Sequence, residues 1–301
     1  MCYMFYFHAQ GDMDQVDAAP GVREVLAQIA ARCAAQAGAE NFPVALRILP
    51  RNVRTDLQHI YDYARFVDDV GDEAPGERST LLDAVAADVH AVSVRRVECA
   101  PVEAMRGLIA GRSMPIEAML KLIAANRMDQ VRTRYETFED LLDYCALSAA
   151  PVGEMVLCVA DAATPANLAD SAAVCAGLQV LEHCQDVRED ALAGRIYLAG
   201  AQLRAAGVQD SDLTGDSTGT ALRTVIAQHV ARARELLEAG VPLVRRVRGW
   251  SRLAISGYVA GGIATADALA AADYDVLARA VRPSTARTAV RAVRLLISGR
   301  T

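Results

Sequence analysis

Two short acidic stretches carry the residues best suited to chemistry. The first, ARFVDDVGDE at residues 64–73, brings Asp68, Asp69 and Asp72 close together. Positions i and i+4 of an α-helix share one face, so Asp68 and Asp72 are expected to line up one turn apart, with Asp69 beside them. Like charges at this spacing repel each other, and their crowding is explained either by a solvated helix end or by a bound cation.

The second stretch, GLQVLEHCQDVREDALAGRIYL at residues 177–198, repeats the arrangement. Glu182, Asp186 and Asp190 follow one another at four-residue intervals, and Gln179 lies one turn earlier on nearly the same side. Hard divalent cations such as Mg²⁺ take oxygen ligands and bind through a few carboxylates together with substrate phosphates. All three carboxylates are therefore candidate metal ligands, as are the three aspartates of the first stretch.

An arginine lies close in sequence to each acidic stretch. Arg65 lies one turn before Asp69, and Arg195 follows Asp190. Arginine binds phosphate oxygens in a bidentate manner, although it also forms ordinary ion pairs with aspartate. Two clusters with adjoining arginines favour a metal–diphosphate site over two solvated faces. His183 points about 100° away from the second stripe and is expected to be a packed residue rather than a catalytic one.

The elements that must position these residues are helices. Apolar residues recur at helical spacing almost without interruption, and no alternating pattern long enough for a strand hairpin is present. The sequence therefore predicts one all-α domain over residues 21–301, after a loose lead at 1–20. The expected helices span residues 21–37, 43–70, 79–92, 101–110, 115–129, 137–160, 166–190, 199–206, 219–239, 241–271 and 284–298.

Composition limits the classes of partner. The net charge of −6 argues against general affinity for nucleic acid or for anionic membranes. Seven cysteines include no CxxC pair and no zinc spacing, which indicates reduced core residues in a cytoplasmic protein. The longest apolar stretch, residues 253–271, contains Asp267 and three glycines and is expected to be a buried helix rather than a membrane span.

Three segments together resemble the squalene/phytoene synthase family: YDYARFVDDVGDE at 61–73, YCALSAAPVGEMVL at 144–157, and LQVLEHCQDVREDALAGRIYL at 178–198. The resemblance implies a single-domain isoprenoid synthase fold, an all-helical bundle around a central cavity. It also implies that Asp68, Asp69, Asp72, Asp186 and Asp190 are catalytic residues that hold Mg²⁺ ions bridging to a diphosphate.

Further site residues are implied by the same resemblance. Residues expected near the diphosphate are Asn41, Arg65, Gln179, Gln185 and Arg195, and residues expected to line the prenyl channel are Phe42, Tyr61, Tyr144, Val152 and Gly153. Tyr61 and Tyr144 offer phenol faces that stabilise a passing carbocation. Two positions depart from the family pattern, because relatives commonly carry Asn where this chain has Glu182 and Arg where it has Gln185.

Within the family, residues 40–50 and 148–154, together with Gln185, look most like hydroxysqualene synthases of hopanoid biosynthesis. The expected reaction is the Mg²⁺-dependent conversion of presqualene diphosphate to hydroxysqualene, with water quenching the cation. NADPH is not expected as a cofactor, but a hydride quench that uses it stays open. One alternative is head-to-head condensation of prenyl diphosphates to presqualene diphosphate, squalene, dehydrosqualene or phytoene. The other is a non-catalytic helical protein that binds metal or a partner.

Apolar substrates suggest loose contact with a membrane surface or with a neighbouring pathway enzyme.

Overall fold

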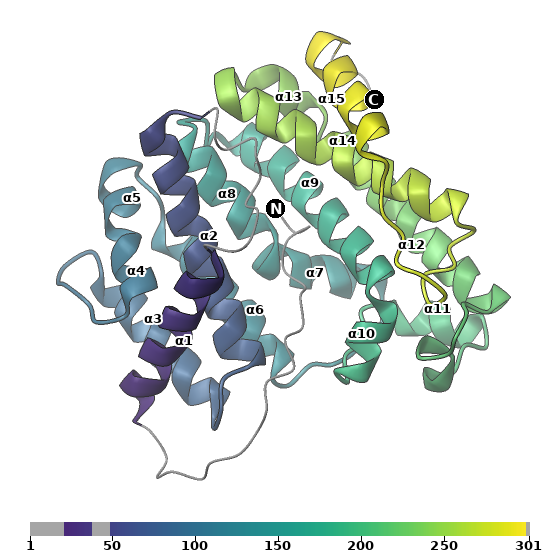
Figure 1. Cartoon of the computed structure of the whole chain (residues 1–301), viewed down its shortest axis with the longest axis horizontal. Helices are drawn as coiled ribbons and strands as arrows, with labels where there is room; N and C mark the ends of the chain where they lie inside the picture. Colours follow the sequence, from purple (N-terminus) through teal and green to yellow (C-terminus); the bar gives the residue numbers. More distant parts are fainter. Residues whose placement is uncertain (1–20, 38–48, 299–301) are drawn as a thin grey trace. The chain divides into compact units, whose positions relative to one another are not determined.

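The computed structural model describes residues 21–37 and 49–298 (Figure 1). Within these ranges the regular elements are helices, and the only β-type pairing is an isolated bridge between Arg134 and Ile196. The all-α prediction is therefore confirmed. The backbone contacts divide the chain into two compact units, residues 1–130 and 131–301, which are described separately.

The first unit is built around α2. Its long helices α1, α2, α3 and α6 pack against one another, and the buried face of α2 contains Ile60, Tyr63 and Phe66. The Tyr63 hydroxyl donates a 3.0 Å hydrogen bond to the carbonyl of Met119 on α6. The helices are α1 (Val22–Ala37), α2 (Arg51–Asp72), α3 (Arg78–Ala91), α4 (Ala100–Ala104), α5 (Arg106–Gly111) and α6 (Ile116–Asp129).

The second unit is organised around α9, which packs against α7, α8, α12, α13 and α14 (Figure 1). Gly177 makes the α9–α12 approach possible, because a Cβ there would lie 2.8 Å from the carbonyl oxygen of Ala233. The elements are α7 (Phe138–Ser148), α8 (Ala150–Val159), α9 (Pro165–Gln185), α10 (Val187–Leu192), α11 (Gly200–Ala205), the 3-10 helix η3 (Asp210–Leu213), α12 (Thr220–Ala239), α13 (Pro242–Arg246), α14 (Gly249–Ala271) and α15 (Thr285–Ser298).

The predicted helices agree with these bounds to within a few residues where the structure describes them, but four are divided. The expected helix 101–110 forms α4 and α5, which meet at Met105. The expected helix 137–160 breaks at Ala149, since Pro151 lacks the N–H that a continuous helix would use. The expected helix 241–271 breaks before Gly249, which has a φ of +60°. The expected helix 166–190 breaks at Asp186, one of the candidate site residues. Residues 43–48 of the second expected helix lie outside the described residues.

Two apolar stretches, Phe138–Val159 and Gly249–Ala271, are long and apolar enough to cross a membrane by length and composition. In each of them 56% of the most apolar window is buried inside the structure. Helices in the core of soluble proteins satisfy the same criteria. The burial of α14 agrees with the interpretation of residues 253–271 as a buried helix.

Candidate functional site

The first acidic cluster lies at the C-terminal end of α2, and its three aspartates have different surroundings. Asp69 is on the buried face, where Arg65 of the same helix approaches one carboxylate oxygen at 2.8 Å. Arg32 of α1 lies 3.3 Å from the other oxygen, and the Cys33 thiol donates a hydrogen bond to that oxygen at 3.2 Å. Asp69 therefore joins α1 to α2, and its charge is already balanced by two arginines.

Asp68 is half-buried beside α6. The Asn126 amide donates a 3.0 Å hydrogen bond to its carboxylate, and this approach depends on Gly71, because a Cβ at that position would lie 2.0 Å from Asn126 Oδ1. Burial, together with the neighbouring carboxylates of Asp72 and Asp69, raises the pKa of Asp68 to about 7, although Asn126 favours the charged form. The site therefore disfavours a negative charge unless a cation is added.

Asp72, one turn beyond Asp68, is exposed to solvent. A half-buried and an exposed carboxylate on adjacent turns suit Mg²⁺, which binds through one or two carboxylates and keeps water or phosphate oxygens as its other ligands. Among residues 21–37 and 49–298, no group of three or more histidine, cysteine or acidic side chains is arranged to hold a metal by itself. The donor set thus fits a metal that is completed by substrate, rather than a closed structural site.

The second acidic cluster lies where α9 passes into α10. Asp186 takes a non-helical conformation between the two helices, with φ −101° and ψ 23°. The four-residue register nevertheless continues, because the Asp186 N–H donates to the Glu182 carbonyl and the Asp190 N–H donates to the Asp186 carbonyl. Burial, followed by the charges of Asp190 and Glu189, raises the pKa of Asp186 to about 7. Both clusters therefore contain one aspartate for which a bound cation would relieve an unfavourable charge.

Asp190 is buried and lies against His183. The His183 Nδ1 is 3.4 Å from the Asp190 carboxylate, and its Nε2 is 3.3 Å from the amide nitrogen of Gln179. These distances place the two ring nitrogens of His183 within reach of the Asp190 carboxylate and the Gln179 amide. His183 is 7% exposed and its ring stacks on Tyr197 at a centroid distance of 3.7 Å. It is therefore a packed positioning residue, as expected.

Aromatic rings surround this histidine. Tyr144 has its ring centroid 6.2 Å from that of His183, 5.4 Å from Tyr197 and 5.4 Å from Tyr135. The guanidinium of Arg132 lies 4.5 Å from the Tyr135 centroid. Tyr144 is among the expected site residues, whereas Tyr135 and Tyr197 are not. Tyr135 and Tyr197 lie in two segments outside the helices, which are joined where the Gly200 N–H donates a hydrogen bond to the Tyr135 carbonyl. Helical periodicity therefore gives no signal for either residue.

The remaining predicted residues are distributed as follows. Tyr61 is buried in α2, and Val152 and Gly153 lie in α8. A Cβ at Gly153 would lie 2.4 Å from Ser171 Oγ, so this glycine allows close packing of α8 on α9. The backbone N–H of Arg195 donates to the Asp190 carbonyl at 2.8 Å. Asn41 and Phe42 lie outside the described residues.

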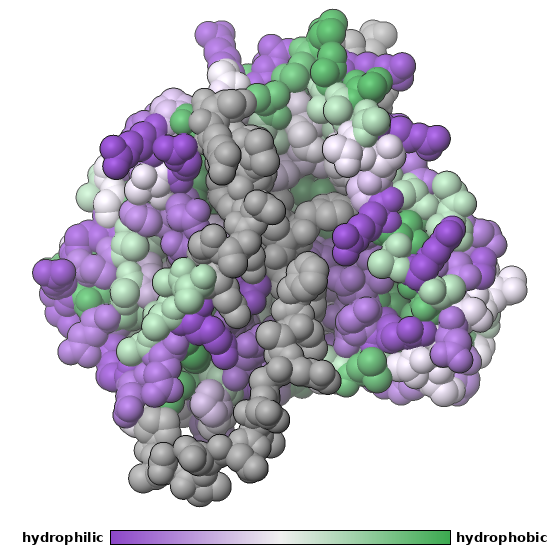
Figure 2. Space-filling model, in the orientation of Figure 1, coloured by the Kyte–Doolittle hydropathy of each residue, from purple (hydrophilic) through white to green (hydrophobic). Residues whose placement is uncertain are grey.

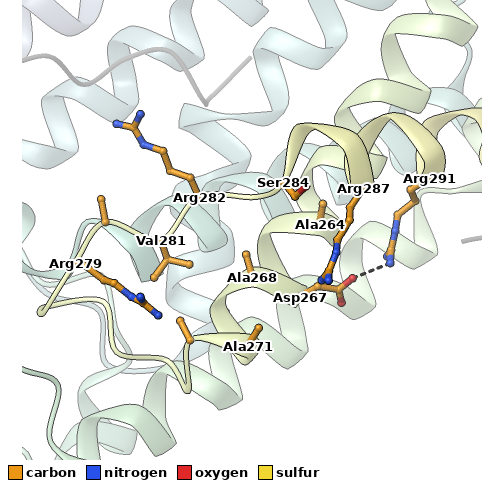
Figure 3. Close-up of a pocket in the computed structure, with 12 residues that line it drawn as sticks. Ala264, Asp267, Ala268, Ala271, Arg279, Val281, Arg282, Ser284, Arg287 and Arg291 are labelled. Carbon is orange, nitrogen blue, oxygen red and sulfur yellow. Dashed lines mark hydrogen bonds and ion pairs between the residues drawn. The ribbon is translucent and has the colours of Figure 1, made fainter.

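An arginine-lined pocket in the second unit was not predicted. It has a volume of about 460 Å³, a floor of small α14 side chains such as Ala264 and Ala268, and a wall formed by residues 279–284 (Figure 3). Arg279 and Arg287 line it, whereas Arg291 lies 2.7 Å from Asp267. Gln185 donates a 2.5 Å hydrogen bond from its amide to the Val281 carbonyl, so this wall is attached directly to the residue before Asp186.

Comparison with known proteins identifies the family. The sequence profile described as "Squalene/phytoene synthase" matches residues 35–289, which is most of the chain. The chain belongs to this family. Its structure is correspondingly an isoprenoid synthase helical fold, in agreement with the expectation from the three motifs.

Individual relatives define the class of enzyme. A hydroxysqualene synthase of Sinorhizobium fredii is 33% identical over 69% of this chain and 72% of the relative. A phytoene synthase of Mycobacterium tuberculosis is 31% identical over 69% of this chain and 65% of the relative. The crystal structure of the squalene synthase HpnC from Alicyclobacillus acidocaldarius superposes with a TM-score of 0.75 and 32% identity, covering 84% of this chain and 99% of that one. The chain is therefore an enzyme of the head-to-head prenyl synthase class, and the non-catalytic alternative is not supported.

Proposed function

We propose that this enzyme converts presqualene diphosphate to hydroxysqualene in a Mg²⁺-dependent reaction in the cytoplasm. The observation that carries the proposal is the pair of aspartates, Asp68 and Asp186, whose pKa values are both raised to about 7 at the ends of two acidic helices. Such carboxylates are stabilised in their charged form by a divalent cation. Asp72 and Asp190, each one turn further along, complete the two sets of oxygen donors.

The reaction begins when the C–O bond to diphosphate breaks and the electron pair leaves with the diphosphate. Mg²⁺ held by these carboxylates would stabilise the negative charge that develops on the leaving group. The remaining cyclopropylcarbinyl cation rearranges, and the oxygen of a water molecule then forms the new C–O bond and releases one proton. Diphosphate and hydroxysqualene are the products, so atoms and charge balance without a reductant.

The chain's own residues have separate tasks in this proposal. Asp69 keeps Arg65 at 2.8 Å and thereby fixes the end of α2 beside the metal-binding carboxylates. The His183 imidazole lies against the buried Asp190 carboxylate and orients it. The Tyr144 ring, whose centroid lies 6.2 Å from that of His183, would offer an electron-rich face to a carbocation. Glu182 adds a further carboxylate one turn before Asp186.

Gln185 supports the assignment to hydroxysqualene formation. At this position relatives of other branches commonly carry arginine, and here the amide bonds to the Val281 carbonyl instead. The positive charge lost there is replaced nearby, because Arg279 and Arg282 stand on either side of Val281 in the wall of the pocket. We propose that Arg279 contributes to diphosphate binding in place of the missing arginine.

A second candidate function is condensation of two prenyl diphosphates, which is favoured by the similarity to a phytoene synthase. Purified protein incubated with Mg²⁺ and either farnesyl or presqualene diphosphate, with and without NADPH, distinguishes the two. Hydroxysqualene formed from presqualene diphosphate without NADPH is the expected result. Turnover of farnesyl diphosphate alone would instead establish the condensation, and a hydrocarbon formed only with NADPH would establish a hydride quench.

A further inference from the structure

The C-terminal part of the chain differs in charge from the rest. Residues 276–301 contain six arginines and no acidic residue, although the whole chain carries a net charge of −6. Most of the described part of this segment is α15 and the pocket wall that precedes it. The net charge of the whole chain argues against a general affinity for anionic membranes, but it does not describe the basic segment at residues 276–301.

Helix α15 is attached to α14 by one face only. Leu295 is fully buried against the unit, Arg291 forms a 2.7 Å ion pair with Asp267, and Arg252 of α14 donates a 2.7 Å hydrogen bond to the Leu296 carbonyl. Figure 3 shows Arg287 and Arg291 directed from α15 toward Asp267. These contacts hold α15 in a fixed orientation along α14, so its outer face is a defined surface rather than a loose tail.

The outer face of α15 is apolar. Val290, Val293 and Ile297 are 53%, 52% and 81% exposed, and they fall within an arc of about 60° on the helix. Arg294 lies about 40° from Val290 on the same face of the helix, beside this apolar stripe. Figure 2 shows apolar atoms over the part of the surface that α15 forms, with hydrophilic atoms next to them. Apolar residues on the solvent side of a surface helix are unusual, because such helices normally turn them inward.

We propose that α15 binds to the surface of a membrane that contains anionic lipids. Val290, Val293 and Ile297 would enter the boundary between head groups and acyl chains, while the exposed Arg294 beside them would contact lipid phosphates. Charge complementarity favours this occupant, because residues 276–301 contain six arginines and no acidic residue. The proposal rests on this surface alone and is independent of the reaction catalysed.

The test uses the full-length protein in flotation with two kinds of vesicle: phosphatidylcholine alone, and phosphatidylcholine mixed with phosphatidylglycerol. We expect the protein to float with the mixed vesicles. The double variant V293D/I297D should lose this binding by roughly tenfold or more, since it removes two apolar contacts and adds two negative charges. The control is V94D/V131D, which also adds two negative charges, at two valines outside α15 that are each 84% exposed.

A charge variant tests the electrostatic part. Arg294→Gln should weaken binding to the mixed vesicles by about fivefold, whereas Arg51→Gln, at an exposed arginine of α2, should not. Circular dichroism melts establish that each variant is folded. The variant V293L/I297L, which keeps both positions apolar, should bind to the mixed vesicles like wild type. The proposal is overturned if the wild-type protein does not float, if V293D/I297D binds like wild type, or if the control loses as much. A change from dimer to monomer on sedimentation, without lipid binding, would assign the stripe to self-association.

Discussion

The carboxyl group of Asp68 is held where a negative charge is unfavourable. It is half-buried, has two acidic neighbours, and receives a hydrogen bond from Asn126. Its pKa of about 7 lies above the ordinary value of 3.8. A native structure keeps such a strained group only when something offsets the cost, and a cation delivered with the substrate would do so.

Replacing Asp68 by Asn tests this directly. The change removes the unfavourable charge and keeps the shape, so the ligand-free variant should be at least as stable as wild type at neutral pH. Turnover should fall by about 10²-fold or more, and the rise in melting temperature produced by Mg²⁺ with inorganic pyrophosphate should disappear. The control is Asp83→Asn, at an exposed aspartate of α3. A variant that melts early, or that keeps full activity, would contradict the assignment.

The pH dependence of stability follows from the same group. Because the folded-state pKa is raised, the folded protein retains a proton between about pH 4 and about pH 7 that the unfolded chain has lost. Asp68 therefore lowers stability progressively as the pH rises through this range. The difference in unfolding free energy between D68N and wild type should grow by at most about 1.4 kcal/mol per pH unit and level off above about pH 7. Urea denaturation at a series of pH values measures it, and a flat difference would exclude the shift.

At the scale of elements, the first cluster depends on how closely α2 approaches α6. Gly71→Ala would place a methyl group 2.0 Å from Asn126 Oδ1, so the variant must displace Asn126 from Asp68. We expect destabilisation of roughly 1–3 kcal/mol by chemical denaturation. Gly107→Ala, in α5, is the matched control, because no atom lies within 4 Å of its added Cβ. Combining Gly71→Ala with Asn126→Ala should recover part of the loss, and no recovery would show that the strain lies elsewhere.

Local patterns predicted most of these elements but not their interruptions. Helix α9 begins at Pro165 after the Thr164 cap, as the TPAN sequence indicates. The four-residue spacing of Glu182, Asp186 and Asp190 correctly predicted their shared register. It could not predict the break at Asp186, because the backbone there keeps its i to i−4 hydrogen bonds on both sides while leaving helical geometry.

Contacts between residues distant in sequence were also not predictable. Nothing in the sequence indicates that Gln185 bonds to the carbonyl of Val281, or that Gly71 makes room for Asn126. The arginine-lined pocket and the pairing of Tyr197 with His183 depend on the same kind of contact. The motifs therefore located the acidic residues, whereas the side chains that hold them in place required the structure.

At the scale of the whole molecule, the proposed reaction needs aspartates from both units. Asp68 and Asp72 belong to residues 1–130, whereas Asp186 and Asp190 belong to residues 131–301. Because the proposed reaction uses both pairs of aspartates, the loss of either pair should abolish turnover.

Mg²⁺ with pyrophosphate should therefore stabilise the wild-type protein by about 2.7 kcal/mol at a concentration a hundredfold above the dissociation constant. D68N and D186N should each abolish this gain, and the double variant should lose no more than either single one. Differential scanning calorimetry measures all four proteins. A variant that keeps the full gain in stability would show that its aspartate takes no part in binding Mg²⁺ with pyrophosphate.

The thiol of Cys33 gives the first cluster a built-in chemical reporter. Its burial, followed by the charge of Asp69 and the hydrogen bond to it, raises the pKa of Cys33 far above the usual range, so the reactive thiolate is scarce while the helices α1 and α2 stay together. The rate at which iodoacetamide alkylates Cys33, measured by mass spectrometry of the peptide that contains it, thus reports how often α1 separates from α2. Slower labelling with Mg²⁺ and pyrophosphate would mean that substrate binding closes the end of α2, and unchanged labelling would mean that this part of the enzyme is already rigid before the substrate arrives.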